Sequence, residues 1–231
     1  MSEKKEPCKP HPQDCDHCQS RHDNPLCSVE GAFETVKSAR TASNFKAGQT
    51  IFYTGNEPLG LYTVQSGLVK LEVLSADGSA HTLRLMGPGQ ALGYRSLFAG
   101  EPYQATAIAV EDSRLCFVPK NTLLGLVDQT PEVAVNLLRR LSDDLRTAEE
   151  KWVAQVDKDA GSRVAEALLF LQDHFKDQSW TRREISEWAG TTPETVMRTL
   201  AQFEKEGWIE AQGRHYQIRD REKILKKAHG T

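Results

Sequence analysis

The sequence has no long apolar run, no dominant charge of one sign and none of the short motifs that mark common enzyme classes. Among its 231 residues, no apolar stretch approaches the roughly 20 residues that a helix needs to cross a bilayer. Residues 1–6 lack the apolar core of a signal peptide. We also find no P-loop, no dinucleotide fingerprint and no nucleophile–base set. We therefore expect a cytoplasmic protein that has no membrane partner and is not an enzyme.

Charge is nearly balanced over the whole chain but differs between its two ends. The net charge of −3 argues against a protein that is coated in basic residues for non-specific binding to nucleic acid. From Ser179 to the last residue, however, ten Lys and Arg stand against eight Asp and Glu, a net charge of +2. The rest of the chain then carries −5. This asymmetry has the sign that a C-terminal DNA-binding module requires.

Cysteine is scarce in the body of the chain and clustered at its start, because four of the five cysteines lie within the first 27 residues. Cys15 and Cys18 are separated by only two residues, so their thiolates can share one metal or cluster. In a cytosolic protein, such clustering suggests a metal site or redox chemistry more than structural disulfides. Residues 1–28 are otherwise polar and aperiodic, which is typical of disorder. Something must order them if they take part in function.

Between residues 45 and 118 the pattern predicts a series of short strands. Turn signals such as Ala47-Gly48 and Asp77-Gly78 recur along this stretch. The segments between them alternate with period two, as where Val69, Leu71 and Val73 are separated by polar residues. Strands that are this short and regular suggest an antiparallel sandwich or barrel.

The periodicity changes at Thr130-Pro131, which is a favoured start for a helix. Apolar residues then recur at spacings of four and three with charged residues on their flanks, the pattern of a heptad seam. A long helix packed on its own domain is the alternative, but a stripe this narrow suits a partner helix better. We expect a dimerisation helix over residues 131–158. The seam residues that carry this expectation are Leu138, Leu141, Leu145 and Trp152.

The C-terminal pattern predicts three helices and a hairpin. An amphipathic helix covers about residues 164–175, and Thr181–Glu184 has the form of a capping box that opens a second helix. After a turn at Gly190, Thr192 caps a third helix that continues to about Glu206. A β-hairpin over residues 208–218 follows. Two short helices, a tight turn and a hairpin in this order describe a winged helix-turn-helix.

The second helix of this motif carries polar residues that suit base recognition. Glu194, Thr195 and Arg198 lie near its N-terminus, whereas Val196 and its apolar neighbours lie on the other side. An Arg can donate two hydrogen bonds to guanine O6 and N7, and a Glu can accept one from cytosine N4. The alternative is that Glu194 and Arg198 only form a surface pair, worth a few tenths of a kcal/mol. We expect a DNA-reading helix.

Residues 180–218 resemble the DNA-binding domain of the Crp/Fnr family, and Pro193–Arg198 resembles the recognition helix of that family. The resemblance also covers the strand region and the long helix. It implies an α+β protein with a cyclic-nucleotide-binding-type β-roll, a long dimerisation helix and a C-terminal winged helix-turn-helix. The implied parts are an N-terminal Cys-rich segment (1–28), a sensor roll (29–130), a dimerisation helix (131–158) and a DNA-binding domain (159–231).

The resemblance also implies partners. Glu194 and Arg198 take the roles of the base-reading pair in the family, so we expect a homodimer on inverted repeats with TGA-like half-sites. Met197 is assigned to the same DNA-contacting surface. It replaces the Ser of oxygen-sensing members, which leaves the outer bases of each half-site open. RNA polymerase is a further expected partner.

The resemblance offers two ligands for the sensor roll. Cyclic-AMP binders carry a Glu and an Arg-Ser pair around the phosphate, but Tyr94 replaces the Glu here and Tyr103-Gln104 replaces the pair. Without the Arg, a buried phosphate loses a bidentate contact, so we do not expect cyclic AMP. Fnr proteins instead hold a [4Fe-4S] cluster with three N-terminal cysteines and one central cysteine. The matching residues here are Cys15, Cys18, Cys27 and Cys116, with Cys8 as a spare.

Several alternatives remain at this point. The spacing from Cys18 to Cys27 is longer than in the best-known Fnr proteins, and Cys116 could be a small buried hydrophobe. The N-terminal Cys and His residues (His11, His17 and His22) could bind zinc instead, or the segment could be a thiol redox switch. A sensor without any ligand, and an iron–sulfur protein that does not bind DNA, are further alternatives. We expect a DNA-binding regulator that senses oxygen or redox state through the cluster.

Overall fold

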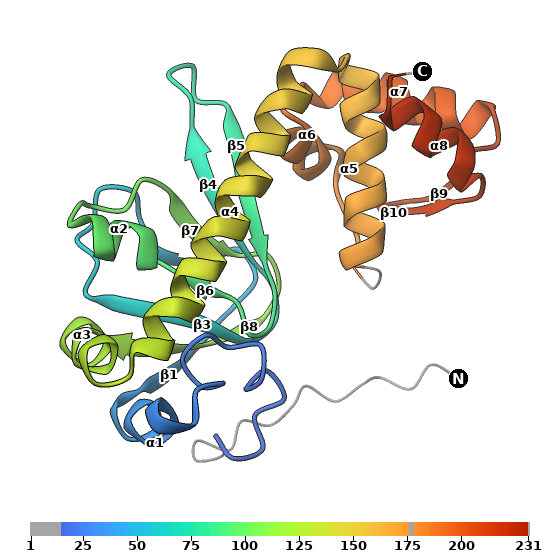
Figure 1. Cartoon of the computed structure of the whole chain (residues 1–231). Coiled ribbons are helices and arrows are strands. Elements are labelled where there is room, and N and C mark those ends of the chain that lie inside the picture. The colour runs from blue at the N-terminus through green and yellow to red at the C-terminus, as the bar shows by residue number, and fades with distance from the viewer. Residues whose placement is uncertain (1–14, 176–177, 231) are drawn as a thin grey trace. The chain divides into compact units, whose positions relative to one another are not determined.

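The computed structural model describes residues 15–175 and 178–230, which form two compact units. The first unit comprises the described residues up to Leu71 together with Leu85–Leu141. The second comprises Glu72–Arg84 together with the described residues from Ser142 onward. Figure 1 shows the elements of both units. In the described part of the chain, no helix has the length and apolarity that crossing a membrane requires.

A β-roll of two four-stranded sheets confirms the expected antiparallel strands, and it belongs to the first unit except for Glu72–Arg84 of the β4–β5 hairpin. The strand orders are β1-β8-β3-β6 and β2-β7-β4-β5. The predicted turns are present, and the glycine of the Ser66-Gly67 turn adopts a φ of +89°. The strands are β1 (Thr41–Phe45), β2 (Thr50–Phe52), β3 (Gly60–Ser66), β4 (Val69–Leu74), β5 (Ala80–Met86), β6 (Ala91–Leu92), β7 (Thr106–Ala109) and β8 (Ser113–Pro119).

Three short helices of the first unit have no counterpart among the sequence predictions. They are α1 (Glu30–Ala39), α2 (Tyr94–Ala99) and α3 (Lys120–Gln129). Their six to ten residues are too few to establish a clear 3.6-residue period. The apolar residues of α1 and α3 instead pack into a core with the first turns of the next helix, where Val36, Leu123 and Val133 are almost fully buried.

The Cys-rich segment is ordered where the structure describes it. Residues 15–28 form a succession of turns, and Leu26 among them is completely buried in the core beneath α1. Asn24 holds the last turn, because its Oδ1 accepts hydrogen bonds from the backbone N–H groups of Leu26 and Cys27. The composition alone is typical of disorder, but one fully buried leucine and an Asx-type turn hold this part of the segment in place.

The expected long helix is confirmed as α4 (Pro131–Asp157). It is followed by α5 (Ala160–His174), α6 (Arg182–Ala189), α7 (Pro193–Lys205), the hairpin of β9 (Ile209–Gln212) and β10 (His215–Ile218), and α8 (Arg221–Ala228). The capping box at Thr181 and Glu184 is present, and Thr192 caps α7 through its side chain. Phe175 lies one residue beyond the end of α5 rather than on its apolar face. Helix α8 was not predicted.

Within the second unit, the hairpin of β4 and β5 is joined to the helices by buried charged groups. Arg84 forms an ion pair with the buried Asp144 of α4. Further along the same helix, Lys151 Nζ lies 3.0 Å from the centroid of the Trp188 ring on α6 and donates a hydrogen bond to Leu83 O (3.1 Å). Burial, with the charge of Arg84 as a second cause, lowers the pKa of Lys151 to about 7.

This depressed pKa predicts that the second unit becomes more stable as the pH rises above 7. Between about pH 7 and the normal lysine pKa of about 10.4, the unfolded chain keeps a proton on Lys151 that the folded chain has released. The free energy of unfolding should therefore increase across this range. All four tryptophans of the chain lie in the second unit, so urea unfolding followed by tryptophan fluorescence measures this unit alone.

Lys151→Met keeps the apolar stem of the side chain and should reduce the increase of the unfolding free energy with pH. Lys223→Met is the control, because Lys223 is an exposed lysine of the same unit that pairs with Asp220. If the unfolding free energy rises equally between pH 7 and 9 in wild type and in Lys151→Met, the pKa of Lys151 does not cause the rise.

Candidate functional site

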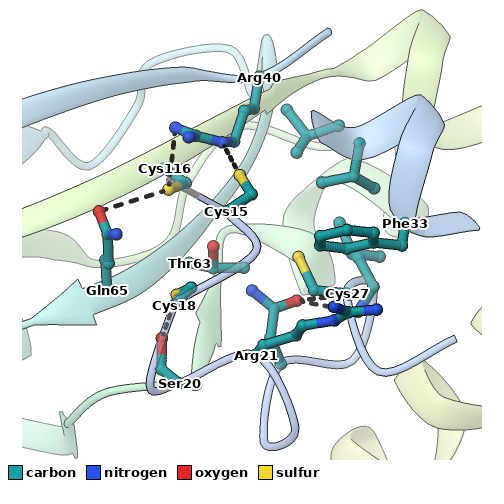
Figure 2. A pocket seen from close by; sticks show the side chains of 14 residues that line it. Cys15, Cys18, Ser20, Arg21, Cys27, Phe33, Arg40, Thr63, Gln65 and Cys116 are labelled. Atoms are coloured by element: carbon teal, nitrogen blue, oxygen red, sulfur yellow. Dashed lines mark hydrogen bonds between the residues drawn. The ribbon is translucent and has the colours of Figure 1, made fainter. Parts of the chain in front are cut away.

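Four thiols line a single cavity in the first unit, as Figure 2 shows. They belong to Cys15, Cys18, Cys27 and Cys116, and all four are free. The space between the lining residues is about 420 Å³ including its opening to solvent, but its walls stand so close together that about one water molecule fits at its centre. The fifth cysteine, Cys8, lies outside the described residues. The structure thus brings together the four cysteines that the sequence singled out.

Two kinds of local structure place these thiols. Cys15 and Cys18 lie in one turn, in which the N–H of Cys18 donates to Cys15 O (3.3 Å). Cys27 follows directly on the buried Leu26 and is therefore held at the edge of the core. Cys116 lies on β8, where it is paired with Ala42 of β1 on one side and with Thr63 of β3 on the other. Thiols that lie in turns therefore face a thiol in the middle of a sheet.

Burial keeps two of these thiols protonated. Burial, together with negative charge on Cys15, Cys116 and Cys18, raises the pKa of Cys27 to about 12. Burial also raises the pKa of Cys116. A bound cation reverses this, since its charge favours the thiolate form. Cys27 and Cys116 are thus suited to a positively charged ligand and release protons when they bind it.

Arg40 is a residue of this site that the sequence analysis missed. Its Nε donates a hydrogen bond to Cys15 Sγ (2.6 Å) and its Nη1 donates a longer one to Cys116 Sγ (3.7 Å), as Figure 2 shows. Arg40 follows the last residue of α1, so no spacing relative to the cysteines could have indicated it. Thr63 and Gln65 of β3 also line the cavity and were likewise not predicted.

The described histidines of the N-terminal segment are not part of the thiol site. His17 and His22 do not line the cavity, and His11 lies outside the described residues. Among the described residues, no three Cys, His, Asp or Glu side chains form a group that could hold one metal ion.

The predicted DNA-reading residues lie on the outer face of α7. Glu194, Met197 and Arg198 are exposed and Thr195 is partly exposed, whereas Val196 and its apolar partners on the opposite face are buried. Arg198 Nη2 lies 3.5 Å from Thr195 Oγ1. The hydrogen bonds of its own backbone and of Thr192 lower the pKa of Glu194, so this carboxylate is charged at neutral pH. A charged acceptor and a cationic donor thus stand one turn apart on an exposed helix face.

The predicted seam of α4 is exposed in the single chain. The exposed fractions of Leu138, Leu141, Leu145 and Trp152 are 61%, 39%, 59% and 69%. On other faces of the same helix, Leu137 and Asp144 are buried. Large apolar residues that stay exposed along one stripe of a long helix are typical of an interaction surface.

Buried aromatic side chains lie in the stretch around α2 that the sequence resemblance matches to the phosphate-binding segment of cyclic-AMP binders. Tyr94, the first residue of α2, is buried, and the Tyr103 ring stacks on Phe52 with a centroid distance of 3.8 Å. Tyr103 also approaches Gly93 so closely that a Cβ there would lie 3.1 Å from its ring. Burial raises the pKa of Tyr103 to about 12, so its hydroxyl is neutral at physiological pH. The aromatic ring therefore lies at the N-terminus of α2.

Comparison with known proteins supports the two-part architecture. Residues 42–130 match a family model for the cyclic nucleotide-binding domain, and residues 162–226 match one for the Crp-like helix-turn-helix domain. A solved structure, a transcriptional regulator of the CRP/FNR family from Thermus thermophilus, is similar with a TM-score of 0.71 and 30% identity. That similarity covers 81% of this chain and 98% of the other.

Two curated relatives match along most of their length. The CRP-like cAMP-activated global transcriptional regulator of Mycobacterium tuberculosis is 30% identical over 86% of this chain and 96% of its own. The fumarate and nitrate reduction regulatory protein of Escherichia coli is 24% identical over 97% of this chain and 92% of its own. With a β-roll, a long helix and a winged helix-turn-helix in the same order as these regulators, the chain belongs to the Crp/Fnr family of transcriptional regulators.

Proposed function

We propose that this regulator senses oxygen or redox state through a [4Fe-4S] cluster held by Cys15, Cys18, Cys27 and Cys116. The observation that carries the proposal is the convergence of these four thiols, from the turn segment and from β8, on one cavity. Four thiolates are the usual complement of such a cluster. The donor set therefore fits the cluster, and the Fnr resemblance leads to the same four residues.

Zinc is the alternative ligand for a Cys-rich site, and metal analysis distinguishes it from the cluster. The relative from Mycobacterium tuberculosis is described as cAMP-activated. In this chain, Tyr94 and Tyr103-Gln104 replace the Glu and the Arg-Ser pair of cyclic-AMP binders, so the phosphate-binding Arg is absent. We therefore propose no role for cyclic AMP.

The chain's own residues suggest how the site acts on the rest of the protein. When bound, the cluster supplies chemistry that responds to oxidants. Three of the thiols lie in the turn segment over residues 15–27, and the fourth, Cys116, lies in the middle of a sheet. A cluster held by all four would tie this segment to the roll. Iron binding thus couples to the position of the N-terminal segment.

The output is DNA binding by a cytoplasmic homodimer, without enzymatic activity. Pairing of two α4 stripes would bury Leu138, Leu141, Leu145 and Trp152 and relate the two chains by a two-fold axis. Two recognition helices about one DNA turn apart then read an inverted repeat. Arg198 suits a guanine and Glu194 a cytosine in TGA-like half-sites, and RNA polymerase is the expected further partner. An iron–sulfur protein that does not bind DNA would have no use for this helix.

The first prediction concerns the cluster. Protein made without oxygen should be brown and contain about four irons per chain. Cys116→Ser should lose the colour and the iron, because an alcohol replaces one of the four thiolate ligands, whereas Cys8→Ser should keep both. Iron analysis and the visible absorption spectrum measure the result. Colourless anaerobic protein with stoichiometric zinc would contradict the cluster and favour a zinc site.

The second prediction concerns the dimer. Leu141→Glu places a charge opposite its own copy in the predicted interface, where an unpaired buried charge costs several kcal/mol. The variant should run as a monomer in sedimentation experiments and bind DNA poorly. Leu124→Glu on α3 is the matched control, because Leu124 and Leu141 are almost equally exposed, at 38% and 39%. A dimeric Leu141→Glu protein with normal DNA affinity would show that the interface lies elsewhere.

The third prediction concerns base recognition. Arg198→Ala should weaken binding to the specific site by about 1–3 kcal/mol and remove discrimination at one base pair. Lys205→Ala, at the other end of α7, is the control for loss of charge, since a phosphate contact would weaken all sequences alike. Selection of random duplexes by each variant measures the preference. If anaerobic wild type with intact cluster and dimer selects no palindrome, sequence-specific regulation is ruled out.

A further inference from the structure

Arg40 is a partly buried cation whose hydrogen-bond acceptors in the described structure include two sulfur atoms. The acceptors are Cys15 Sγ at 2.6 Å and Cys116 Sγ at 3.7 Å. Within the described residues, no carboxylate forms an ion pair with this guanidinium. An arginine is thus buried against groups that carry negative charge only as thiolates.

The fold fixes Arg40 at this position. Its backbone N–H caps α1 by donating to Val36 O (3.0 Å), and the next residue, Thr41, begins β1 and pairs with Phe117 of β8. Ala42 lies opposite Cys116 in this antiparallel register, so Arg40, two residues before Ala42, lies diagonally across from Cys116. The guanidinium then reaches across to Cys15 on the turn segment. One side chain therefore bridges the turn segment and the sheet.

Arg21 is a second arginine of the thiol cavity and differs from Arg40 in its contacts. It lines the same cavity, but its guanidinium carbon lies 3.6 Å from the centroid of the Phe33 ring. In Figure 2 it lies beside Cys27 and Phe33, away from the thiols of Cys15 and Cys116. The two arginines share charge and location within one cavity and differ in whether they donate to the sulfurs of Cys15 and Cys116.

We propose that Arg40 is a positioning residue of the thiol site: it clamps Cys15 to Cys116 in the metal-free chain, and it stabilises cluster-bound thiolates by N–H···S hydrogen bonds and positive charge. This inference rests on the proposed cluster. A cluster held by four thiolates is anionic, and hydrogen bonds to the sulfurs and net charge set its reduction potential. Removing a cation and two donors disfavours the more negative, reduced cluster. Loss of Arg40 should therefore lower the potential.

The test on iron-loaded protein compares Arg40→Met with Arg21→Met and Arg40→Lys, all prepared without oxygen. Arg40→Met should lose iron to a chelator about 10–100-fold more readily, which is the usual effect of removing an outer hydrogen-bond partner of a metal ligand. Its midpoint potential, measured by redox titration, should fall below that of wild type. Arg40→Lys should lie in between, since it keeps the charge without the planar fork. Arg21→Met, which removes the same charge but no hydrogen bond to the sulfurs of Cys15 and Cys116, should retain iron as wild type does and lower the potential less than Arg40→Met does.

A second measurement uses the metal-free protein and does not depend on the cluster. Amide hydrogen exchange of residues 15–20 should become several-fold faster in Arg40→Met, because the clamp on Cys15 is gone. Lys37→Met is the matched control for a lost contact to the same turn, since Lys37 donates to Asp16 at its surface. It should leave iron retention and potential unchanged. Circular dichroism confirms that each variant is folded.

The outcomes separate this inference from the proposed function. If wild type takes up no iron, the proposed cluster fails, and unchanged exchange in metal-free Arg40→Met overturns the clamp as well. If wild type binds the cluster but Arg40→Met retains iron and potential as Arg21→Met does, the inference about Arg40 is overturned and the cluster stands. Faster exchange without a change in iron retention or potential likewise overturns the role of Arg40 toward the cluster.

Discussion

The pairing of β8 with β1 on one side and β3 on the other is the constraint on which the sensor depends. Through this register Cys116 lies opposite both Ala42 and Thr63, in the middle of a sheet. The same pairing places Arg40 and the floor of the thiol cavity. A strand slipped by one residue would turn Cys116 to the other face of the sheet and remove it from the cavity. Cys15, Cys18 and Cys27 lie in the turn segment, whereas Cys116 is held by paired strands on both sides.

The chemistry of the thiol cavity favours a positively charged ligand. Several thiols and an arginine are gathered in a partly buried space where the pKa values of Cys27 and Cys116 are raised. The segment is held by the core, in which Leu26 and Val36 are almost fully buried. A positively charged ligand would favour the thiolate form that burial disfavours, and its binding would stabilise the folded segment, so ligand binding and order are thermodynamically linked.

The two faces of α4 show how one helix serves two purposes. Its inner face carries Leu137, Asp144 and Lys151 at intervals of seven residues, and these contact the apolar core or the β4–β5 hairpin. Its outer stripe carries leucines and a tryptophan that remain exposed in the single chain. Family members are typically dimers, and a helix this long with an uncovered apolar stripe fits that state. The ion pair of Arg84 and Asp144 joins this inner face to the β4–β5 hairpin.

The sequence by itself determined those features whose signals are local. Heptad spacing defined α4, side-chain caps at Thr181 and Thr192 defined α6 and α7, and alternation with glycine turns defined the antiparallel strands. These signals act over one turn or one strand, so a single chain displays them without a partner segment. The clustered cysteines likewise stood out by spacing. The domain boundaries proposed from sequence remain a prediction.

Only the tertiary structure decided which distant residues meet. Helices α1 and α3 are stabilised by burial against the roll rather than by periodicity, and the turn segment is held by Leu26 in a core that its own polar composition does not suggest. Arg40 enters the thiol site because β1 pairs with β8, and Lys151 meets Trp188 because α4 packs on α6. Such contacts join residues that are tens of positions apart, and their free energy depends on burial that exists only after the chain has folded.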